Sequence, residues 1–318
     1  MGENIQVSVI CNAFNHGKYI RDALEGFIKQ KTNFTFEVLV HDDASTDNTA
    51  EIIREYEAKY PDIIKPIYQT ENQYSKKIKI TRTFQVPRIK GKYVALCEGD
   101  DYWTDPLKLQ KQYDFMEANP DYTMCTCSTV WFDMKLGKAK NKCSTLEDRD
   151  VPIEEIILEK KGRVFQYATF FLRSDIFLQV PEWFSHFKVG DFPLSLHAAA
   201  TGKVRMLADT MAVYRYGVPG SLSDRAENID FRTDVLSKSI EGLSEFNKMT
   251  DNKYNEVIVK RIKMTKYNLA RRNCDFKAMR SGELREIYLS KNLPHRMSDF
   301  VMCKFPKLHS WVVQILSK

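Results

Sequence analysis

The sequence of 318 residues has no hydrophobic run long enough to span a bilayer and no glycine-rich nucleotide-binding turn after its first predicted strand. The N-terminus also lacks a basic leader with an apolar core, so we expect a cytoplasmic protein. Where a dinucleotide oxidoreductase would need GxGxxG, the chain has Asn12-Ala13-Phe14-Asn15. The same turn lacks the aspartate that an aspartyl-nucleophile phosphoryl-transfer enzyme normally places there. Both enzyme classes are therefore disfavoured.

Cysteine is scarce and odd in number, and the chain contains no internal repeat and no low-complexity tract. Seven cysteines, several of them in strand-like runs, indicate reduced thiols in the core rather than a disulfide framework. Hydrophobic residues make up 43% of the chain, which is enough for a substantial core. The length fits one large α/β domain with an appendage, or two modest domains.

The net charge of +6 is unevenly distributed along the chain. From Val235 onward, lysine and arginine exceed aspartate and glutamate by about nine, so the earlier part is slightly acidic. A basic C-terminal module could face nucleic acid, anionic lipid or an acidic substrate, although a solvated helical face is the commoner case. Residues 300–318 mix apolar residues with lysines. This pattern fits an interfacial helix on an anionic membrane, and it fits equally a helix docked on the main domain.

Strand-like and helical segments alternate through the first two thirds of the chain. The short connections between them predict a mostly parallel α/β sheet of the Rossmann type, flanked by helices and with right-handed crossovers. The polar segment 133–148 is predicted to be a loop or hairpin that could close over a ligand. The expected strands are residues 5–11, 36–40, 63–70, 93–97, 122–132, 164–172 and 205–216, and the expected helices are residues 19–30, 49–60, 107–118 and 194–201.

A turn cluster at residues 217–221 separates this alternating part from two long helical segments, 229–246 and 254–272. The exposed faces of these helices are basic. We therefore divide the chain into a sheet-containing domain, residues 1–220, and a basic helical extension, residues 221–318.

Three carboxylates, Glu98, Asp100 and Asp101, directly follow the predicted strand 93–97. In an open α/β sheet, ligands bind in the crevice beyond the carboxyl ends of the strands. Carboxylates gathered there repel one another unless protons or a cation neutralise them, and oxygen donors suit Mg²⁺ or Mn²⁺ carrying a phosphate-bearing substrate. The segment predicts a metal-nucleotide site; a solvated acidic turn is the alternative.

A second strand end is also acidic, because Asp42 and Asp43 follow strand 36–40 and Asp47 precedes the next helix. Asp47 is predicted to cap that helix, and the other two could equally be turn residues. The histidines show no metal-ligand spacing, so we expect them to be satisfied in the fold or solvated.

Three segments resemble a known family: VSVICNAFNHGKYI from Val7, FEVLVHDDASTDNT from Phe36 and GKYVALCEGDDYWTDPLKLQKQ from Gly91. They are similar to the family 2 glycosyltransferases, inverting enzymes with a GT-A fold, of the bacterial surface-polysaccharide type. A fourth and looser segment, VGDFPLSLHAAATGKVRMLADTMAVYRY from Val189, resembles the acceptor-side region of that family. The resemblance extends to about Ser223 and does not include the helical extension.

The resemblance implies a role for each matching residue. Asp101 would ligate a divalent cation that bridges the donor diphosphate, Asp100 would support the metal or the ribose, and Asp191 would be the general base. Glu98 stands where the family usually has the first aspartate of its DxD-like motif, and its role is the least defined. Residues expected at the nucleotide base are Ala13, Phe14, Asn15 and either Asp42 or Asp43, and Arg82 is expected against the nucleotide or its phosphates.

The chain departs from the family pattern in two places. Tyr214-Arg215 is followed by Tyr216 where the family often has a histidine, and the familiar acidic pair at the base is Gly190-Asp191 here. Some of these residues could also have purely structural roles. Asp191 could be a helix N-cap and Arg82 a surface arginine, while the aromatic pair 102–103 could stack on a sugar or, more commonly, pack under the helix.

These residues predict a metal-dependent inverting glycosyltransferase, with Mn²⁺ or Mg²⁺ as cofactor. It would transfer a hexosyl or hexosaminyl group from a nucleotide-diphosphate donor, expected to be a UDP-sugar, to a glycan or lipid-linked oligosaccharide. A cation stabilises the leaving diphosphate, and one carboxylate takes the proton of the acceptor hydroxyl. We expect no nucleic-acid partner, and the basic tail could give peripheral contact with the inner face of the cell membrane. The alternatives are a non-catalytic nucleotide-sugar-binding protein and a metal-dependent phosphoryl-transfer enzyme.

Overall fold

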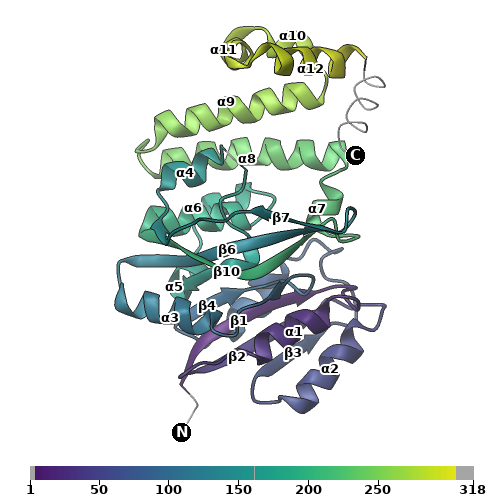
Figure 1. Ribbon diagram of the computed structural model, residues 1–318, viewed down its shortest axis with the longest axis vertical. Coiled ribbons are helices and arrows are strands. Elements are labelled where there is room, and N and C mark those ends of the chain that lie inside the picture. The colour runs from purple at the N-terminus through teal and green to yellow at the C-terminus, as the bar shows by residue number, and fades with distance from the viewer. Residues whose placement is uncertain (1–3, 161, 306–318) are drawn as a thin grey trace. The chain divides into compact units, whose positions relative to one another are not determined.

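A computed structural model describes residues 4–160 and 162–305 (Figure 1). The chain divides into two compact units. Unit 1 comprises Met1–Pro181 and Asp191–Asp224 and contains the sheet, whereas unit 2 comprises Glu182–Gly190 and Arg225–Lys318 and is helical. All seven cysteines are free thiols, as predicted. Four of them lie in the core as expected, but Cys143 and Cys303 are half-buried and Cys274 is exposed.

Unit 1 is built on a sheet that contains ten strands within the described residues. The strand order is β3-β2-β1-β4-β9-β6-β10-β5, with β7 on β6 and β8 on β10. The neighbours β1–β2, β2–β3, β1–β4 and β6–β10 are parallel, which confirms the predicted α/β class with a mostly parallel sheet. The strands are β1 (Ile5–Ala13), β2 (Thr35–Asp42), β3 (Ile64–Tyr68), β4 (Tyr93–Leu96), β5 (Tyr102–Trp103), β6 (Tyr122–Asp133), β7 (Lys138–Lys142), β8 (Arg149–Asp150), β9 (Phe171–Arg173) and β10 (Lys203–Tyr216).

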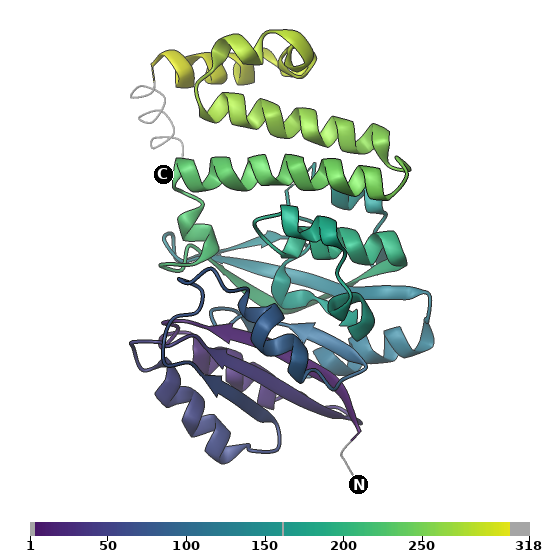
Figure 2. The same ribbon diagram turned by 180° about the vertical axis from the view of Figure 1, so that it is seen from behind.

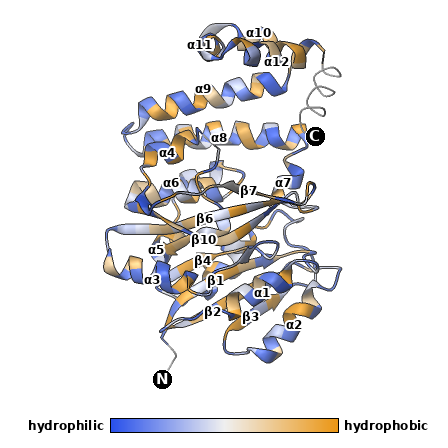
Figure 3. Cartoon of the chain, viewed as in Figure 1, coloured by the Kyte–Doolittle hydropathy of each residue, from blue (hydrophilic) through white to orange (hydrophobic). Residues whose placement is uncertain are grey.

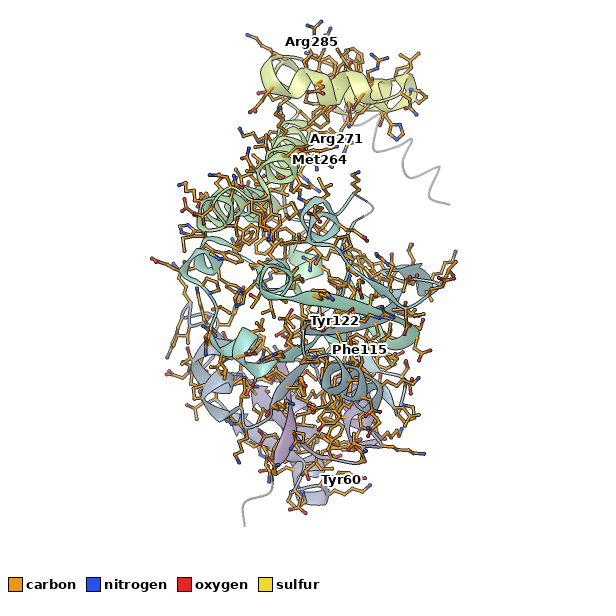
Figure 4. All side chains as sticks on the ribbon, turned by 90° about the vertical axis from the view of Figure 1, so that its left-hand side faces the viewer. Tyr60, Phe115, Tyr122, Met264, Arg271 and Arg285 are labelled. Carbon is orange, nitrogen blue, oxygen red and sulfur yellow. The ribbon has the colours of Figure 1, made fainter. Side chains whose placement is uncertain are left out.

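The helices of unit 1 cover the sheet with apolar faces. In α1, buried Ile20, Ala23, Leu24 and Phe27 recur at helical spacing. Figure 3 shows hydrophobic residues concentrated in the central strands, and Figure 4 shows Phe115 of α3 beside Tyr122 of β6, with ring centroids 4.8 Å apart. The helices are α1 (Ile20–Ile28), α2 (Thr49–Lys59), α3 (Lys108–Ala118), α4 (Ile153–Leu158), α5 (Ser174–Leu178), α6 (Asp191–Thr201) and α7 (Leu222–Arg225).

Gly26 allows α1 to approach β5 closely. A Cβ atom at this position would lie 2.9 Å from the carbonyl oxygen of Trp103, closer than real contacts allow. Trp103 itself packs under the helices, since it is buried, meets Phe27 edge to face and donates its indole N–H to Ala168 O at 2.8 Å. Packing is therefore the role of Trp103, as the sequence favoured.

One segment differs from its predicted structure, and another forms elements that were not predicted. Residues 164–172 were expected to form one strand, but a 3-10 turn at Tyr167–Thr169 leaves only β9, which runs antiparallel to both β4 and β6. The strand prediction is therefore wrong for most of this segment. Residues 81–88 form two short helical turns, η1 (Thr81–Gln85) and η2 (Val86–Arg88), on the face of the sheet opposite α1 (Figure 2).

The predicted hairpin at residues 133–148 is present, because β7 pairs antiparallel with β6. Met134 N–H at the start of this hairpin donates to Tyr216 O at 2.9 Å, which joins the hairpin to the end of β10. The predicted strand at residues 63–70 is β3, which lies at one edge of the sheet. An edge position tolerates Pro66, which cannot donate a ladder hydrogen bond.

Unit 2 has its own packing. Trp183 of η4 lies edge-on to Phe246 of α8, with ring centroids 4.9 Å apart, and a second small core surrounds Tyr267. No helix in the described ranges 4–160 and 162–305 is long and apolar enough to cross a membrane. The elements are η4 (Glu182–His186), α8 (Ile229–Met249), α9 (Asn255–Arg272), α10 (Phe276–Met279), η5 (Gly282–Leu284), α11 (Arg285–Ser290) and α12 (Leu293–Lys304).

Candidate active site

The acidic turn that follows β4 is hydrogen-bonded to the end of β1. Gly99 N–H donates to Asn12 O at 2.9 Å. Because β1 and β4 are parallel neighbours, their carboxyl ends meet at the same edge of the sheet. The turn at residues 98–101 therefore lies beside the loop at residues 12–17.

Asp101 is the most enclosed of the three carboxylates, with 3% of its surface exposed. Its Oδ1 accepts a hydrogen bond from the backbone N–H of Arg215 at 2.8 Å. Burial and then the charge of Asp100 raise the pKa of Asp101 well above its ordinary value, although the Arg215 contacts oppose this. The surroundings thus disfavour the ionised form of Asp101, and a bound cation would stabilise it.

Glu98 has a different environment from its two neighbours. Its carboxylate accepts hydrogen bonds from the backbone N–H of Asn12 at 3.2 Å and from Asn12 Nδ2 at 3.3 Å. Burial and then the charge of Asp100 raise the pKa of Glu98 to about 8. Glu98 therefore joins β1 to the acidic turn, which leaves Asp100 and Asp101 as the available carboxylates.

The two available carboxylates fit a cation that arrives with its substrate. In the part of the chain that the structure describes, no group of three or more His, Cys, Asp or Glu side chains is arranged to hold a metal ion. Mg²⁺ and Mn²⁺ are commonly bound by one or two carboxylates together with water and substrate phosphate oxygens. Asp100 and Asp101 provide such an incomplete set, and a nucleotide diphosphate would complete it.

Arg215, at the end of β10, holds the acidic turn in place. Its Nη1 donates to Asp100 O at 2.9 Å, its Nη2 pairs with Asp22 of α1, and its guanidinium lies 4.4 Å from the ring centre of Tyr102. Arg215 is 9% exposed. It therefore places a buried positive charge beside the carboxylates, a role that the sequence did not predict.

Asp42 and Asp43 are both buried at the end of β2, but their partners differ. The carboxylate of Asp43 accepts from Gln73 N–H at 2.8 Å and from Tyr74 N–H at 3.0 Å. Asp42 accepts from Ser45 N–H through Oδ2, whereas its buried Oδ1 has no hydrogen-bond partner. Burial raises the pKa of Asp42. The unsatisfied oxygen makes Asp42 the better candidate for a ligand contact.

The loop at residues 13–15 is interlocked with residues 45–47. Asn15 has a positive φ of 56°, donates its N–H to Ser45 Oγ at 2.9 Å, and accepts from Thr46 N–H at 2.8 Å. Phe14 is 43% exposed, whereas Ala13 is buried. The loop thus presents an aromatic ring beside the ends of β1 and β2.

Asp47 caps the start of α2, although it is the residue before the N-cap position, which Asn48 occupies. Its Oδ1 accepts from Thr49 N–H at 3.0 Å and its Oδ2 accepts from Gly17 N–H at 2.9 Å. Asn48 is the residue that directly precedes the helix, and its side chain makes no capping hydrogen bond. Asp47 therefore has the capping function that the sequence predicted.

Arg82 lies on η1, next to a residue that contacts β1. Its Nη1 donates to the carbonyl oxygens of Phe177 at 3.0 Å and Leu178 at 3.3 Å, at the end of α5. The neighbouring Thr81 accepts from Asn12 Nδ2 at 3.0 Å. The structure thus gives the guanidinium of Arg82 backbone partners, and its contact with the nucleotide stays a prediction.

Asp191, the predicted base, is the first residue of α6 and forms an ion pair with Arg163. Its Oδ1 also accepts from the N–H of Phe192 at 2.8 Å, and 12% of the side chain is exposed. Both members of the ion pair line a small pocket. Its other lining residues are Ile156, Glu159, Val164, Phe165, Phe170, Phe192 and Ser195.

Tyr214, on β10, connects the acidic turn with the Arg163–Asp191 pair. Burial raises the pKa of Tyr214 to about 12, and its hydroxyl also feels the charges of Asp101, Arg163 and Asp100. The charges of the predicted metal ligands and of Arg163, the partner of the predicted base, therefore both reach the hydroxyl of Tyr214. The site thus has a carboxylate pair at the end of β4 and a separate carboxylate at the start of α6.

The comparison with protein families is consistent with this arrangement. The model of glycosyl transferase family 2 matches residues 8–180, more than half of the chain. The chain belongs to glycosyl transferase family 2. This assignment makes it a glycosyltransferase and confirms the family predicted from the strand-end motifs.

Two relatives illustrate the range of similarity within the family. An uncharacterized protein of Mycobacterium bovis is 32% identical over 246 residues, which cover 74% of this chain and 67% of that protein. The UDP-Glc:alpha-D-GlcNAc-diphosphoundecaprenol beta-1,3-glucosyltransferase WfaP of Escherichia coli is 33% identical over 112 residues, 35% of this chain and 41% of WfaP.

Two solved structures of glycosyltransferases share the fold. TarS of S. aureus in complex with UDP-GlcNAc matches with a TM-score of 0.59 and 19% identity, over 94% of this chain and 81% of that one. The mannosyltransferase PcManGT of Pyrobaculum calidifontis, in complex with GDP-Man and Mn²⁺, matches with a TM-score of 0.54 and 14% identity. This match covers 100% of this chain and 89% of that one. The GT-A fold predicted for this family 2 member is confirmed.

The structure brings together most of the residues that the family motifs indicated. The acidic turn at 98–101, the loop at 13–15 and the Asp42-Asp43 pair meet through backbone hydrogen bonds. Sequence reasoning did not assign roles to Arg163, Tyr214 or Arg215. Arg163 lies in no recognised motif, and the other two attracted notice only because a histidine does not follow them.

Proposed function

We propose that this protein is a metal-dependent, inverting glycosyltransferase that uses a UDP-sugar donor and acts on a glycan or lipid-linked oligosaccharide. The observation that carries this proposal is the carboxylate pair of half-buried Asp100 and buried Asp101 at the end of β4, together with the Arg163–Asp191 ion pair, whose arginine charge also reaches Tyr214. The TarS complex with UDP-GlcNAc and the lipid-linked acceptor in the name of WfaP support the donor and acceptor classes. Residues 1–220 would form the catalytic domain and residues 221–318 a helical extension.

The donor would bind across the ends of β1, β2 and β4. The unsatisfied Oδ1 of Asp42 would accept a hydrogen bond from the nucleotide base, and Phe14 would lie against that base. Asp100 and Asp101 would hold Mn²⁺ or Mg²⁺, which stabilises the charge that develops on the leaving diphosphate. The Mn²⁺ in the PcManGT complex supports this cofactor class.

Asp191 would act from the acceptor side of the site. A carboxylate there takes the proton of the acceptor hydroxyl as that oxygen attacks the anomeric carbon, while the bond to the diphosphate breaks. This single displacement inverts the anomeric centre and needs no protein nucleophile. Arg163 would hold the carboxylate of Asp191 in place until the acceptor arrives.

Donor binding and chemistry can be separated by two variants. The full chain, with Mn²⁺ and a panel of UDP- and GDP-sugars, is expected to bind at least one UDP-sugar in calorimetry and to hydrolyse it slowly. Asp101→Asn should weaken Mn²⁺-dependent donor binding about tenfold or more, since one carboxylate ligand is lost. Asp191→Asn should bind the donor as the native chain does and lose at least about 100-fold in donor turnover.

The opposite results would contradict the proposal. If no nucleotide sugar binds and none is hydrolysed, the assignment of a nucleotide-sugar enzyme fails. Loss of donor binding in Asp191→Asn would make this residue part of the scaffold rather than the base. Unchanged turnover in that variant would remove it from the chemistry altogether.

We also propose that unit 2 contacts an anionic membrane surface at α12. Leu293, Met297 and Phe300 are 62%, 58% and 42% exposed and recur at i, i+4 and i+7, so they form an apolar stripe on one face. Lys304 extends the same face by one turn. Most of the predicted interfacial segment, residues 306–318, lies outside the described residues.

A further inference from the structure

Three aromatic side chains lie together at the ends of β6 and β10. Trp131 of β6 is in register with Tyr214 of β10, and the two rings are 5.1 Å apart between centroids. The ring of Tyr216 stacks on Trp131 at 5.6 Å and 17°. All three are half-buried and none belongs to the buried core of the molecule. We call Trp131, Tyr214 and Tyr216 the aromatic cluster.

The aromatic cluster is connected to the ion pair of the predicted base. The indole of Trp131 lies beside the thiol of Cys143, and that thiol is 2.9 Å from the carbonyl oxygen of Arg163. Arg163 in turn pairs with Asp191. A continuous set of contacts therefore runs from the aromatic cluster to the carboxylate that would deprotonate the acceptor.

The cluster also borders the predicted donor side. Tyr214 is followed on β10 by Arg215, whose backbone N–H donates to Asp101 Oδ1 at 2.8 Å. A ligand that rests on the cluster would lie beside both halves of the reaction. None of the donor contacts proposed above uses these three rings.

We propose that the aromatic cluster is the subsite for the acceptor, and that a pyranose ring of a glycan packs on Trp131 and Tyr216. A pyranose has an apolar C–H face and a polar rim, and tyrosine and tryptophan match it because each combines an apolar ring with a polar group. The cluster would hold the acceptor sugar while one of its hydroxyls reaches Asp191. This inference rests on the proposed function and names the acceptor class of the same site.

Saturation-transfer NMR on the full chain, saturated with UDP and Mn²⁺, tests the subsite directly. The probes are the methyl pyranosides of glucose, galactose and N-acetylglucosamine. We expect at least one to bind, with Trp131→Leu and Tyr216→Leu weakening it about tenfold, because the stacking surface is lost. Trp131→Phe and Tyr216→Phe keep a ring and should stay within about threefold of the native affinity.

Tyr60→Leu is the matched control for loss of an aromatic ring. Tyr60 stacks on Tyr56 at the end of α2 and lies at the lower end of unit 1 in Figure 4. Pyranoside affinity in this variant should equal that of the native chain. UDP-sugar affinity, measured by calorimetry, should be unchanged in all five variants, which also establishes that each is folded.

The results distinguish failure of the subsite from failure of the proposed function. A native chain that binds a UDP-sugar but none of the pyranosides overturns the subsite alone. The subsite is also overturned if Trp131→Leu and Tyr216→Leu bind the pyranosides as tightly as the native chain does. A loss of pyranoside affinity in Tyr60→Leu as large as in those two variants would overturn it as well. A native chain that binds no UDP-sugar overturns the proposed function, and the subsite that depends on it is then also wrong.

Discussion

Asp42 and Asp43 are adjacent in sequence and equally buried, yet their surroundings give them opposite expected roles. The carboxylate of Asp43 is occupied by two backbone N–H groups of residues 73 and 74, which it fixes above the end of β2. The buried Oδ1 of Asp42 has no partner. Sequence reasoning could not choose between them, because the distinguishing contacts come from a loop about 30 residues away.

The two aspartates should therefore respond differently to the same substitution. Asp42→Asn should weaken UDP binding about tenfold, because an amide presents a different donor and acceptor pattern to the base, and should change the free energy of unfolding little. Burial already disfavours the charge of Asp42, so removing that charge costs no stability. Asp43→Asn should lower the free energy of unfolding by about 2 kcal/mol, because one backbone N–H loses its acceptor.

Calorimetry with UDP and urea unfolding of the same two variants provide the measurements. Each variant is the control for the other, since both remove one carboxylate from the same strand end. A stable Asp43→Asn with weakened UDP binding, beside an Asp42→Asn that binds normally, would reverse the two roles.

Sequence motifs do not identify every residue of a site, as is the case here for Arg163, Tyr214 and Arg215. Arg215 contacts Asp101 across 114 positions of sequence, and Arg163 is paired with Asp191 by the packing of a connecting segment against α6. Motifs describe residues close together along the chain. Charge partners supplied by a distant strand or loop leave no local pattern, so only the folded chain identifies them.

At the level of elements, apolar runs predicted the strands well where the strands are central and parallel. Strand β2 is buried along nearly its whole length, and the predicted run 36–40 lies inside it. The run 164–172 is equally apolar, but Thr169 N–H and Oγ1 both bond to Gln166 O and close a tight turn. Hydrophobicity alone cannot distinguish such a buried turn from a strand.

The helices of unit 2 are joined by one buried carboxylate. Asp299 of α12 accepts hydrogen bonds from Tyr267 Oη at 2.6 Å, Arg271 Nε at 2.5 Å and Lys291 Nζ at 3.0 Å. Burial alone would raise the pKa of Asp299, but these three hydrogen bonds outweigh it and lower the pKa below its ordinary value of 3.8. The ionised carboxylate thus stabilises the folded form of the α9–α12 region.

Asp299→Asn should lower the stability of this region by about 3 kcal/mol at neutral pH, because it leaves buried donors and a partly buried cation unpaired. In the native chain this contribution is complete above pH 3.8 and is lost as the pH falls through the lower pKa of the folded state. The variant should lack that acid-dependent loss. Hydrogen exchange of the α9 and α12 amides, near neutral pH and in acid, measures both effects.

Glu283→Gln is the control for loss of a negative charge in the same unit. Glu283 pairs with Lys266, and both side chains are nearly half exposed, so the change should stay within about 0.5 kcal/mol. Equal amide protection in Asp299→Asn and the native chain would show that the buried carboxylate does not join these helices.

At the scale of the whole molecule, the sequence predicted two parts of different character, and the chain divides into a sheet-containing unit and a helical unit. The catalytic residues that we propose all lie in unit 1, which leaves the exposed stripe of α12 without a role in the chemistry. Leu293, Met297 and Phe300 would insert apolar side chains between lipids, and Lys304 would attract anionic headgroups. A lipid-linked acceptor would make such contact useful, because it holds the enzyme at the surface where its substrate resides.

Sedimentation with vesicles tests this contact. The full chain should bind vesicles that contain phosphatidylglycerol and should bind pure phosphatidylcholine vesicles at least about tenfold more weakly, with added salt removing the difference.

Leu293→Glu and Met297→Glu should each reduce binding about tenfold, because a carboxylate enters the apolar stripe and faces anionic headgroups. Val259→Glu, at an apolar side chain of α9 that is 40% exposed, introduces the same charge outside the stripe and should bind as the native chain does. An equal loss of vesicle binding in all three variants would show that net charge alone determines binding. Undiminished binding in the two α12 variants would exclude this helix as the membrane contact.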